Sequence, residues 1–134
     1  MGSLKAFIVE DSAVIRDSLV AALEEMVSLK VVGTAEDEVG ALAWLADAGH
    51  ECDIAIVDIF LRRGTGLNVL RALQQSGRAA DRVVLTNYAT DEIRRRALAV
   101  GASRVFDKSS DIEALVEHCI ALAEAAAPRQ APPA

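Results

Sequence analysis

Five polar side chains stand at the ends of short apolar runs that are spread along most of the chain. They provide three carboxylates, one hydroxyl and one ammonium: Glu10, Asp11, Asp58, Thr86 and Lys108. Two carboxylates about 4 Å apart repel by roughly 4 kcal/mol at an effective dielectric constant near 20, so three acids held together are unfavourable on their own. A divalent cation would remove this repulsion, and hard oxygen ligands of this kind suit Mg²⁺.

The same set of side chains suits phosphoryl transfer. An attacking carboxylate must approach a phosphoryl group that already carries negative charge, and Mg²⁺ bridging the two makes that approach tolerable. Asp58 would be the nucleophile and would form an acyl phosphate. Lys108 would oppose the charge on one phosphoryl oxygen, while the Thr86 hydroxyl would bond another.

Asp58 ends the run Ile-Ala-Ile-Val at 54–57, which shows no polar alternation. Such a run is typical of a central strand in a parallel sheet, covered on both faces. In open α/β sheets ligands bind at the carboxyl edge of the strands, so the position of Asp58 favours chemistry over packing.

Apolar runs alternate with segments of helical periodicity along the whole chain. This alternation predicts an α/β fold with a parallel sheet and helices on both faces, and the flavodoxin-like (βα)5 order 2-1-3-4-5 is the natural candidate. The strands are predicted at 5–9, 30–34, 53–58, 82–86 and 104–107. The helices are predicted from Asp11 or Ser12, over 37–48 and 67–75, from Thr90 or Asp91, and from Asp111.

Each helix is expected to bury one stripe of apolar residues. In the first helix this stripe is Ile15, Leu19, Ala22, Leu23 and Met26, with Arg16 on the solvated face; in the second it is Val39, Leu42, Leu45 and Ala46. In the fourth helix Ile93, Ala97 and Val100 are expected to face inward, and Arg94, Arg95 and Arg96 largely outward.

Several further residues are expected to have structural roles only. Gly64 and Gly66 form no GxGxxG or GxxxxGK[ST] pattern, so turn geometry explains them better than phosphate binding. Trp44 lies at the margin of its helical stripe, which favours partial packing. His50 and His118 are expected to be exposed, with no catalytic or metal partner nearby in the sequence.

Composition indicates one acidic domain. The chain has 134 residues, 52% hydrophobic content and a net charge of −6, which argues against a surface for nucleic acid or anionic membrane. It contains neither an apolar run of about 20 residues nor a leader segment, so a cytoplasmic location is expected. The domain is expected at 4–125, with a disordered tail or linker stub at 126–134. Cys52 and Cys119 are expected to be free and buried.

The ordered set of Val-Glu10-Asp11, Ile-Val-Asp58 with Gly66 eight residues on, Leu-Thr86 and Asp-Lys108 resembles the receiver domain of bacterial two-component response regulators. The resemblance extends from about Leu4 to Ala125. It implies that Asp58 accepts phosphate from a sensor histidine kinase or a histidine phosphotransfer protein, in a domain that is not a turnover enzyme. The implied Mg²⁺ ligands are Asp11, Asp58 and the main-chain carbonyl of Phe60, with Glu10 orienting metal-bound water. Thr86 and Lys108 would couple phosphorylation to a surface that binds an unknown downstream partner.

The chain departs from the pattern of that family at several positions. Arg62 replaces a usual proline four residues after the phosphoacceptor, and Ser109 replaces the proline after Lys108, so a cis peptide bond is not expected there. Val105 stands where the family's switch aromatic normally lies, with Phe106 next to it, and Asn87 follows Thr86 where a small residue is usual.

Phe60 and Tyr88 fall at positions that, by the same resemblance, flank the attacking water. We hypothesise that these two aromatic side chains shield the acyl phosphate and slow its hydrolysis.

Two other functions are compatible with a flavodoxin-like fold. A flavin-binding protein would need a Ser/Thr/Gly-rich loop after the first strand, where Glu10 and Asp11 would repel the flavin phosphate. An aspartate-nucleophile phosphatase would be expected to show Asp-x-Asp, whereas Phe60 stands two residues after Asp58. The simplest alternatives for the acids and the lysine are helix capping by Glu10 and Asp11 and a surface ion pair of Lys108 with Asp107 or Asp111.

Overall fold

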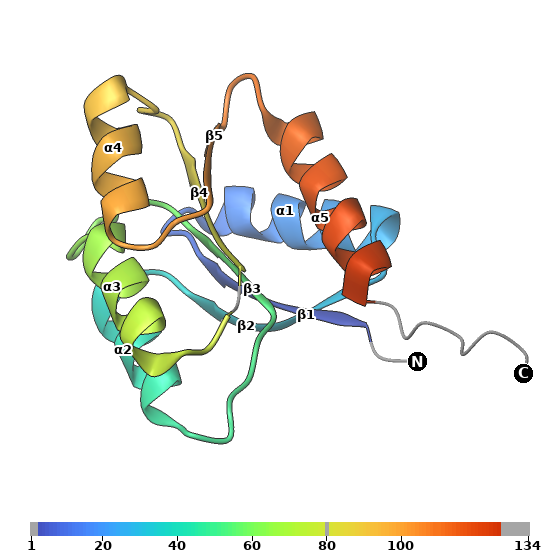
Figure 1. Cartoon of the computed structure of the whole chain (residues 1–134), viewed down its shortest axis with the longest axis horizontal. Helices are drawn as coiled ribbons and strands as arrows, with labels where there is room; N and C mark the ends of the chain where they lie inside the picture. Colours follow the sequence, from blue (N-terminus) through green and yellow to red (C-terminus); the bar gives the residue numbers. More distant parts are fainter. Residues whose placement is uncertain (1–2, 80, 127–134) are drawn as a thin grey trace, which may run out of the picture.

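The computed structural model describes residues 3–79 and 81–126, which form a five-stranded parallel sheet alternating with five helices (Figure 1). The strand order is β2-β1-β3-β4-β5, so the predicted flavodoxin-like fold is confirmed. The strands are β1 (Leu4–Val9), β2 (Leu29–Ala35), β3 (Ile54–Val57), β4 (Asp81–Thr86) and β5 (Arg104–Asp107). The helices are α1 (Ala13–Met26), α2 (Glu38–Ala46), α3 (Gly66–Ser76), α4 (Asp91–Ala99) and α5 (Ile112–Ala126).

The predicted tail at 126–134 lies outside the described residues, except for Ala126 at the end of α5. Within residues 3–79 and 81–126, no helix combines the length and apolar character needed to cross a bilayer.

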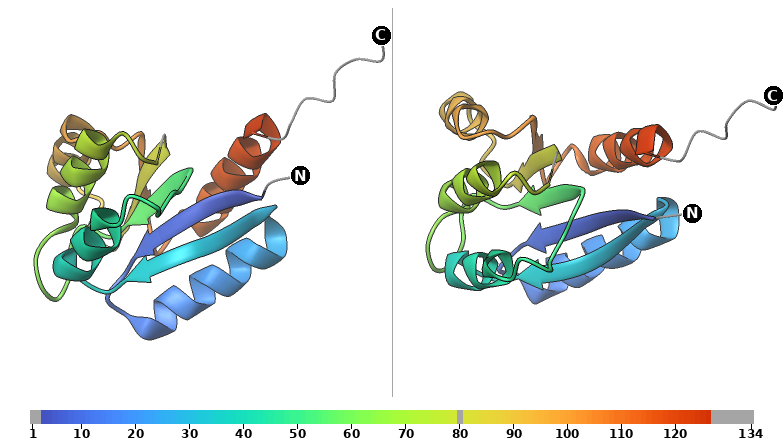
Figure 2. Two further views of the ribbon diagram at one scale, coloured as in Figure 1. Left: turned by 90° about the horizontal axis from the view of Figure 1, so that it is seen from below. Right: turned by 60° about the horizontal axis from the view of Figure 1, so that its bottom comes forward.

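Helices cover both faces of the sheet, as Figure 2 shows. Alternate residues of β3 point to opposite sides: Ile54 and Ile56 pack in the core under α1 and α5, while Ala55 and Val57 pack in the core under α2, α3 and α4. All four side chains are at most 1% exposed. The prediction of a central strand buried on both faces is therefore confirmed.

Four helices begin with a side chain that accepts a backbone N–H, which satisfies a group that the first turn leaves unpaired. Of the alternatives that the sequence left open, Ser12 caps α1 and Thr90 caps α4, with oxygen-to-nitrogen distances of 3.3 Å to Ile15 and 3.2 Å to Ile93. Asp37 caps α2 and Thr65 caps α3 in the same way.

The buried stripes of α1 and α2 are narrower than predicted. In α1 only Leu19 and Leu23 are buried, while Met26 is 60% exposed. In α2 Ala41 and Leu45 are buried, and Val39, expected to face inward, is 73% exposed. Ile15 and Leu42 were also expected inside but are exposed, as is Ala46. In each helix the fully buried residues form an i, i+4 pair on one face, while Val20 of α1 and Trp44 of α2 pack against the core partly buried.

Trp44 packs between two other rings, in agreement with its predicted packing role. Its ring stacks on Phe7 with centroids 4.1 Å apart and on His50 with centroids 4.6 Å apart. A Cβ at Gly33 would lie 2.3 Å from the Trp44 indole nitrogen, so the glycine leaves room for the ring above β2. His50, which was expected to be exposed, is half-buried, and its Nδ1 also lies 2.7 Å from the Trp44 carbonyl oxygen.

The prediction that His118 is exposed is also wrong. Its Nε2 lies 2.5 Å from Asp81 Oδ2, and the two side chains are only 16% and 14% exposed. The Phe106 ring meets the imidazole edge to face, with centroids 5.7 Å apart. This contact joins α5 to β4 and β5 across 37 residues of sequence, which no local pattern reveals.

Both cysteines are free and buried, as predicted. Burial raises the pKa of Cys52 to about 11 and that of Cys119 to about 12. The thiolate is the reactive form of cysteine, so both side chains act as small apolar core residues at neutral pH.

Arg78 closes the end of a helix that is distant in sequence. Its guanidinium donates to the carbonyl oxygens of Asp47 and His50, each at 3.1 Å, and to that of Leu45. The last carbonyls of a helix lack partners within the helix, so Arg78 satisfies the end of α2 and the turn after it.

We expect Arg78→Ala to lower the free energy of unfolding by about 2 kcal/mol, since hydrogen bonds to charged groups contribute about 1.5–3 kcal/mol each in measured series. Urea denaturation of the variant and the parent measures this loss. Arg71→Ala is the matched control. Arg71 is exposed on α3 and, within the described part of the chain, its side chain bonds only the nearby Asn68, so the loss should stay within about 0.5 kcal/mol. Equal losses in the two variants would contradict the capping role.

Candidate functional site

The carboxyl ends of β1, β3, β4 and β5 lie at the same edge of the sheet and bring the predicted site residues together. Val9 pairs with Val57, Val57 with Val84, and Thr86 with Asp107, so the ends of these strands lie close together at this edge. The polar side chains at these ends, or one or two residues beyond them, are Glu10, Asp11, Asp58, Thr86 and Lys108. The cluster predicted from the strand ends is therefore present in the fold, while the roles of its members stay predictions.

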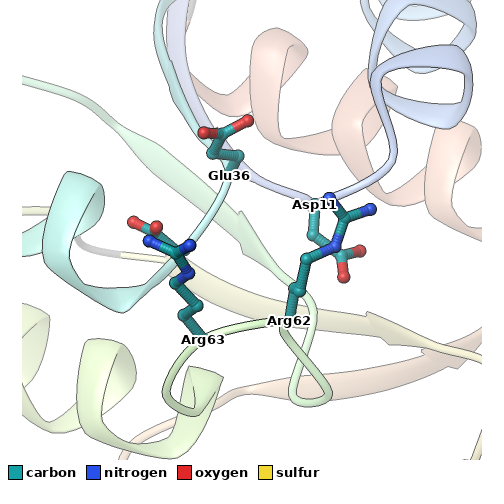
Figure 3. A pocket seen from close by; sticks show the side chains of 5 residues that line it. Asp11, Glu36, Arg62 and Arg63 are labelled. Atoms are coloured by element: carbon teal, nitrogen blue, oxygen red, sulfur yellow. The ribbon is translucent and has the colours of Figure 1, made fainter.

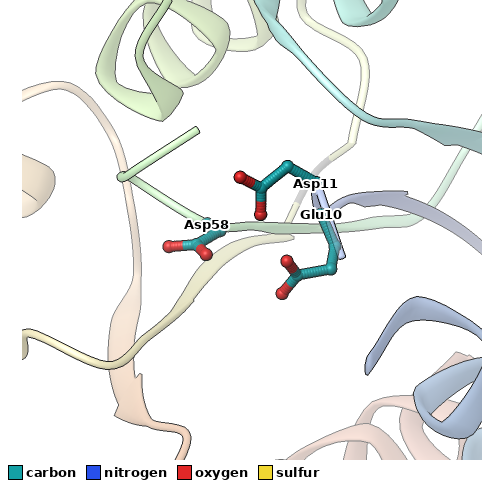
Figure 4. Close-up of side chains that lie close together, drawn as sticks. All are labelled: Glu10, Asp11 and Asp58. Carbon is teal, nitrogen blue, oxygen red and sulfur yellow. The ribbon is translucent and has the colours of Figure 1, made fainter. Parts of the chain in front are cut away.

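Three carboxylates converge at this edge (Figure 4). One oxygen from each of Glu10, Asp11 and Asp58 lies within 4.8 Å of the other two. Glu10 and Asp58 are 2% and 6% exposed, while Asp11 is half-buried at the rim. Cations such as Mg²⁺ bind oxygen at about 2.0–2.1 Å, so small adjustments would place all three groups around one ion. The donor set, made only of hard oxygens, fits a divalent cation.

Lys108 reaches into the acidic cluster. Its Nζ lies 2.7 Å from Asp58 Oδ2 and also bonds Glu10 Oε1, and its side chain is only 9% exposed. The alternative of a surface ion pair is wrong: the Asp111 carboxylate accepts the Asp107 amide at 2.9 Å instead. Lys108 is thus held against the predicted nucleophile.

One ammonium does not balance three carboxylates, and the local charge is −2 when all four groups are ionised. Burial, the largest influence, raises the pKa of Glu10 even though Lys108 bonds it. Burial alone would lower the pKa of Lys108, but its hydrogen bonds to Asp58 and Glu10 and the negative charge of these two groups together outweigh burial and raise the pKa above its ordinary value. The lysine therefore stays charged, and a divalent cation would bring the cluster to neutrality.

Backbone amides hold the polar side chains in place. Glu10 Oε2 accepts from Ser12 N at 3.0 Å, and Asp58 Oδ1 accepts from Phe60 N at 3.2 Å. Thr86 is fully buried, and its hydroxyl oxygen accepts from Tyr88 N at 3.3 Å. A hydroxyl accepts and donates at once, so Thr86 can keep this bond while donating to another oxygen at the site.

Two residues that support the site were not identified from the sequence. Arg16 was placed on the solvated face of α1, yet its guanidinium donates to the Glu10 carbonyl oxygen at 2.9 Å. Glu38, in the first turn of α2, accepts from Thr65 N at 2.9 Å and from the Asn68 side chain at 3.1 Å, which anchors the loop between β3 and α3. These bonds cross 6 to 30 residues of sequence without a repeating pattern.

The two glycines of that loop have different roles. Gly64 has φ of +81°, so turn geometry explains it as predicted. Gly66 begins α3 without a positive φ, and turn geometry does not account for it. A Cβ there would lie 2.0 Å from the Asp58 carbonyl oxygen and 2.9 Å from Ile59 Cα. Gly66 is therefore required by the close approach of α3 to the backbone of the predicted phosphoacceptor.

Two arginines border the acidic site from the β3–α3 loop. Arg62 and Arg63 line a cavity of about 150 Å³ together with Asp11, Glu36 and Asp37 (Figure 3). Arg62 also lines a neighbouring cavity of about 510 Å³. The residue that replaces the family's usual proline therefore adds positive charge at the entrance to the site.

Phe60 and Tyr88 meet at the open side of the site. Their rings contact edge to face, with centroids 5.1 Å apart and planes at 77°. The side chains come from the loops that follow β3 and β4, and they are 46% and 61% exposed. Two large, partly exposed rings in mutual contact next to a buried carboxylate agree with the predicted shielding role, which stays a prediction.

Two further departures lie within β5 and just after it. Val105 and Phe106 are 8% and 1% exposed, so both point into the core. The described residues contain no cis peptide bond, in keeping with Ser109 after Lys108.

The fold and the site define a flavodoxin-like α/β domain that carries an acidic cation site and a lysine at the carboxyl edge of its sheet. The chain belongs to the response regulator receiver domain family, whose model matches residues 6–120. Domains of this family bind a divalent metal at their acidic cluster and are phosphorylated by histidine kinases. The flavin-binding and phosphatase alternatives are therefore set aside.

Individual relatives agree with this assignment. The chain is 34% identical over 100 residues to the DNA-binding transcriptional activator DevR/DosR of Mycobacterium tuberculosis, covering 75% of this chain and 45% of that protein. It spans about half or less of the length of the curated relatives it matches.

Solved structures share the fold. The response regulator domain of Thermotoga maritima CheB superposes with a TM-score of 0.76 at 20% identity, over 95% of this chain and all of that domain. The Mn²⁺-bound form of response regulator Rcp1 superposes with a TM-score of 0.69 at 18% identity, over 98% and 99% of the two chains.

Proposed function

We propose that this chain is a phosphorylation-switched signalling module in which Asp58 is the phosphoacceptor. The observation that carries the proposal is the convergence of three carboxylates and one buried lysine on the end of β3, in a chain of the receiver family. The donor would be a sensor histidine kinase or a histidine phosphotransfer protein. We place the module in the cytoplasm.

The chemistry follows from the positions of the side chains. An Asp58 carboxylate oxygen attacks phosphorus, the bond from phosphorus to the donor nitrogen or oxygen breaks, and the leaving group takes the electron pair. Lys108 Nζ, already 2.7 Å from Asp58, opposes charge on a phosphoryl oxygen as the new bond forms. The Thr86 hydroxyl donates to a second phosphoryl oxygen.

The acids around Asp58 would hold the metal. Asp11, Asp58 and the main-chain carbonyl of Phe60 would bind Mg²⁺ directly, and Glu10 would orient metal-bound water. Bound there, Mg²⁺ supplies the positive charge that lets two anions approach each other. The Mn²⁺-bound form of response regulator Rcp1, which shares the fold, supports the binding of a divalent cation.

Incubation with a small acyl phosphate and Mg²⁺, followed by intact-mass measurement, tests the proposal. The chain should gain about 80 mass units, the mass of one phosphoryl group, and should gain none when EDTA replaces Mg²⁺. No gain with any of several acyl phosphate or phosphoramidate donors would overturn it.

The ring pair allows a separate prediction. Truncating Phe60 or Tyr88 opens the approach of water to the acyl phosphate, so we expect Phe60→Ala and Tyr88→Ala to speed self-dephosphorylation by about tenfold. Loss of mass from the phosphorylated chain over time measures this rate. Leu98→Ala, which shortens an equally exposed apolar side chain on α4, is the control and should leave the rate unchanged. Unchanged rates in both ring variants would remove the shielding role.

A further inference from the structure

Arg94 bonds the backbone of two separate segments of the chain. Its Nε donates to the Ala89 carbonyl oxygen at 3.1 Å, and its Nη1 donates to the Val105 carbonyl oxygen at 3.0 Å. Ala89 comes three residues after Thr86, and Val105 comes three residues before Lys108. One planar guanidinium in α4 therefore holds both of the segments that lead to the proposed phosphoryl-binding side chains.

The expectation that the three consecutive arginines of α4 point largely outward holds for Arg95 and Arg96 but not for Arg94. Arg95 and Arg96 are exposed, whereas Arg94 is half-buried. Among residues 3–79 and 81–126, no carboxylate forms an ion pair with Arg94. Its guanidinium instead donates hydrogen bonds from two nitrogens of one rigid plane to two carbonyl oxygens. The single ammonium group of a lysine cannot reproduce this geometry.

Both bonded carbonyls belong to backbone segments that are connected to the proposed phosphoryl-binding residues, Thr86 and Lys108. Thr86 Oγ1 accepts the Tyr88 amide at 3.3 Å, and the Tyr88 carbonyl accepts the Thr90 amide at 2.8 Å, so the loop before α4 is a continuous chain of short contacts. On the other side, β5 is the edge strand, and its outer carbonyls have no neighbouring strand. Arg94 takes one of these edge carbonyls and ties it to the helix.

We propose that Arg94 is the positioning residue that transmits a shift of the Thr86 and Lys108 segments to helix α4. When a phosphoryl group on Asp58 takes new bonds from Thr86 and Lys108, the backbone segments that carry these two residues shift. The Ala89 and Val105 carbonyls move with their segments, and the Arg94 guanidinium carries the displacement to α4. The inference rests on the proposed phosphorylation of Asp58. The proposed role of Arg94 adds the physical link between the phosphorylation site and the surface of helix α4.

Hydrogen exchange with and without the phosphoryl mimic beryllium trifluoride and Mg²⁺ tests the link. In the parent, exchange of α4 amides should change by about fivefold, the factor that corresponds to one net hydrogen bond. In Arg94→Ala this change at α4 should be lost, while the change at residues 86–88 persists. Arg95→Ala is the matched control and should respond like the parent.

The controls separate transmission from stability and from the proposed function. Arg78→Ala is destabilised at a distant site and should keep the exchange response at α4. If a general loss of stability were enough to abolish that response, Arg78→Ala would lose it as well. Arg94→Lys keeps the positive charge but has one ammonium group in place of the guanidinium, so it should lose most of the exchange response at α4. The same variant tests the inference if Arg94→Ala does not fold. An α4 response of parental size in either Arg94 variant would overturn the inference. A parent chain that never gains the phosphoryl mass would instead overturn the proposed function.

Discussion

Asp58→Asn gains no phosphoryl mass from an acyl phosphate and Mg²⁺ under conditions in which the parent chain is fully modified. This is the largest effect that we expect, because a neutral amide is not a nucleophile toward phosphorus and because the substitution removes one cation ligand. The side chain keeps its shape, and its oxygen can still accept the Phe60 amide that now bonds Asp58 Oδ1. The fold should be retained, as circular dichroism can verify.

Asp17→Asn is the control for Asp58→Asn. Asp17 is an exposed carboxylate on α1, and its substitution makes the same change in charge away from the site. It should be modified at the parental rate. A phosphoryl gain in Asp58→Asn equal to that of Asp17→Asn would mean that another side chain is the acceptor, and peptide mapping would identify it.

Gly66→Ala lowers the free energy of unfolding by about 3 kcal/mol or more and impairs phosphorylation at the same time. The added methyl would lie 2.0 Å from the Asp58 carbonyl oxygen and 2.8 Å from its carbon, and these are backbone atoms that cannot rotate away. Relief requires α3 to retreat from β3, which costs about 1–3 kcal/mol or more in a well-packed core and displaces the nucleophile. Urea denaturation and the initial rate of mass gain measure the two effects.

Gly49→Ala is the control for Gly66→Ala. At Gly49 the nearest atom to an added Cβ is the end of the exposed Asp47 side chain, at 3.2 Å, so the loss should stay within about 0.5 kcal/mol. A Gly66→Ala variant as stable and as active as Gly49→Ala would show that the close approach of α3 to Asp58 is not required.

The amino-acid sequence by itself determined the order of the elements, the central strand and the members of the acidic cluster. Apolar runs such as 54–57 and the capping residues are local signals, because each depends on neighbours within a few positions. Parallel strands have their carboxyl ends at one edge, so the side chains after β1, β3, β4 and β5 had to meet once that topology was inferred. Helix faces were predicted less well, since α1 and α2 bury only one row of residues.

Only the tertiary structure decided which groups those side chains contact. The pairing of Lys108 with Asp58 spans 50 residues, and the hydrogen bonds of Arg78 span about 30. Arg94 looked identical to Arg95 and Arg96 in the sequence, yet it alone of the three bonds the backbone of two other segments. Position 66 requires a glycine because the Asp58 carbonyl oxygen leaves no room for a Cβ. Such contacts depend on how whole elements are placed and closely packed in space. The periodicity of residues along the chain does not contain this information.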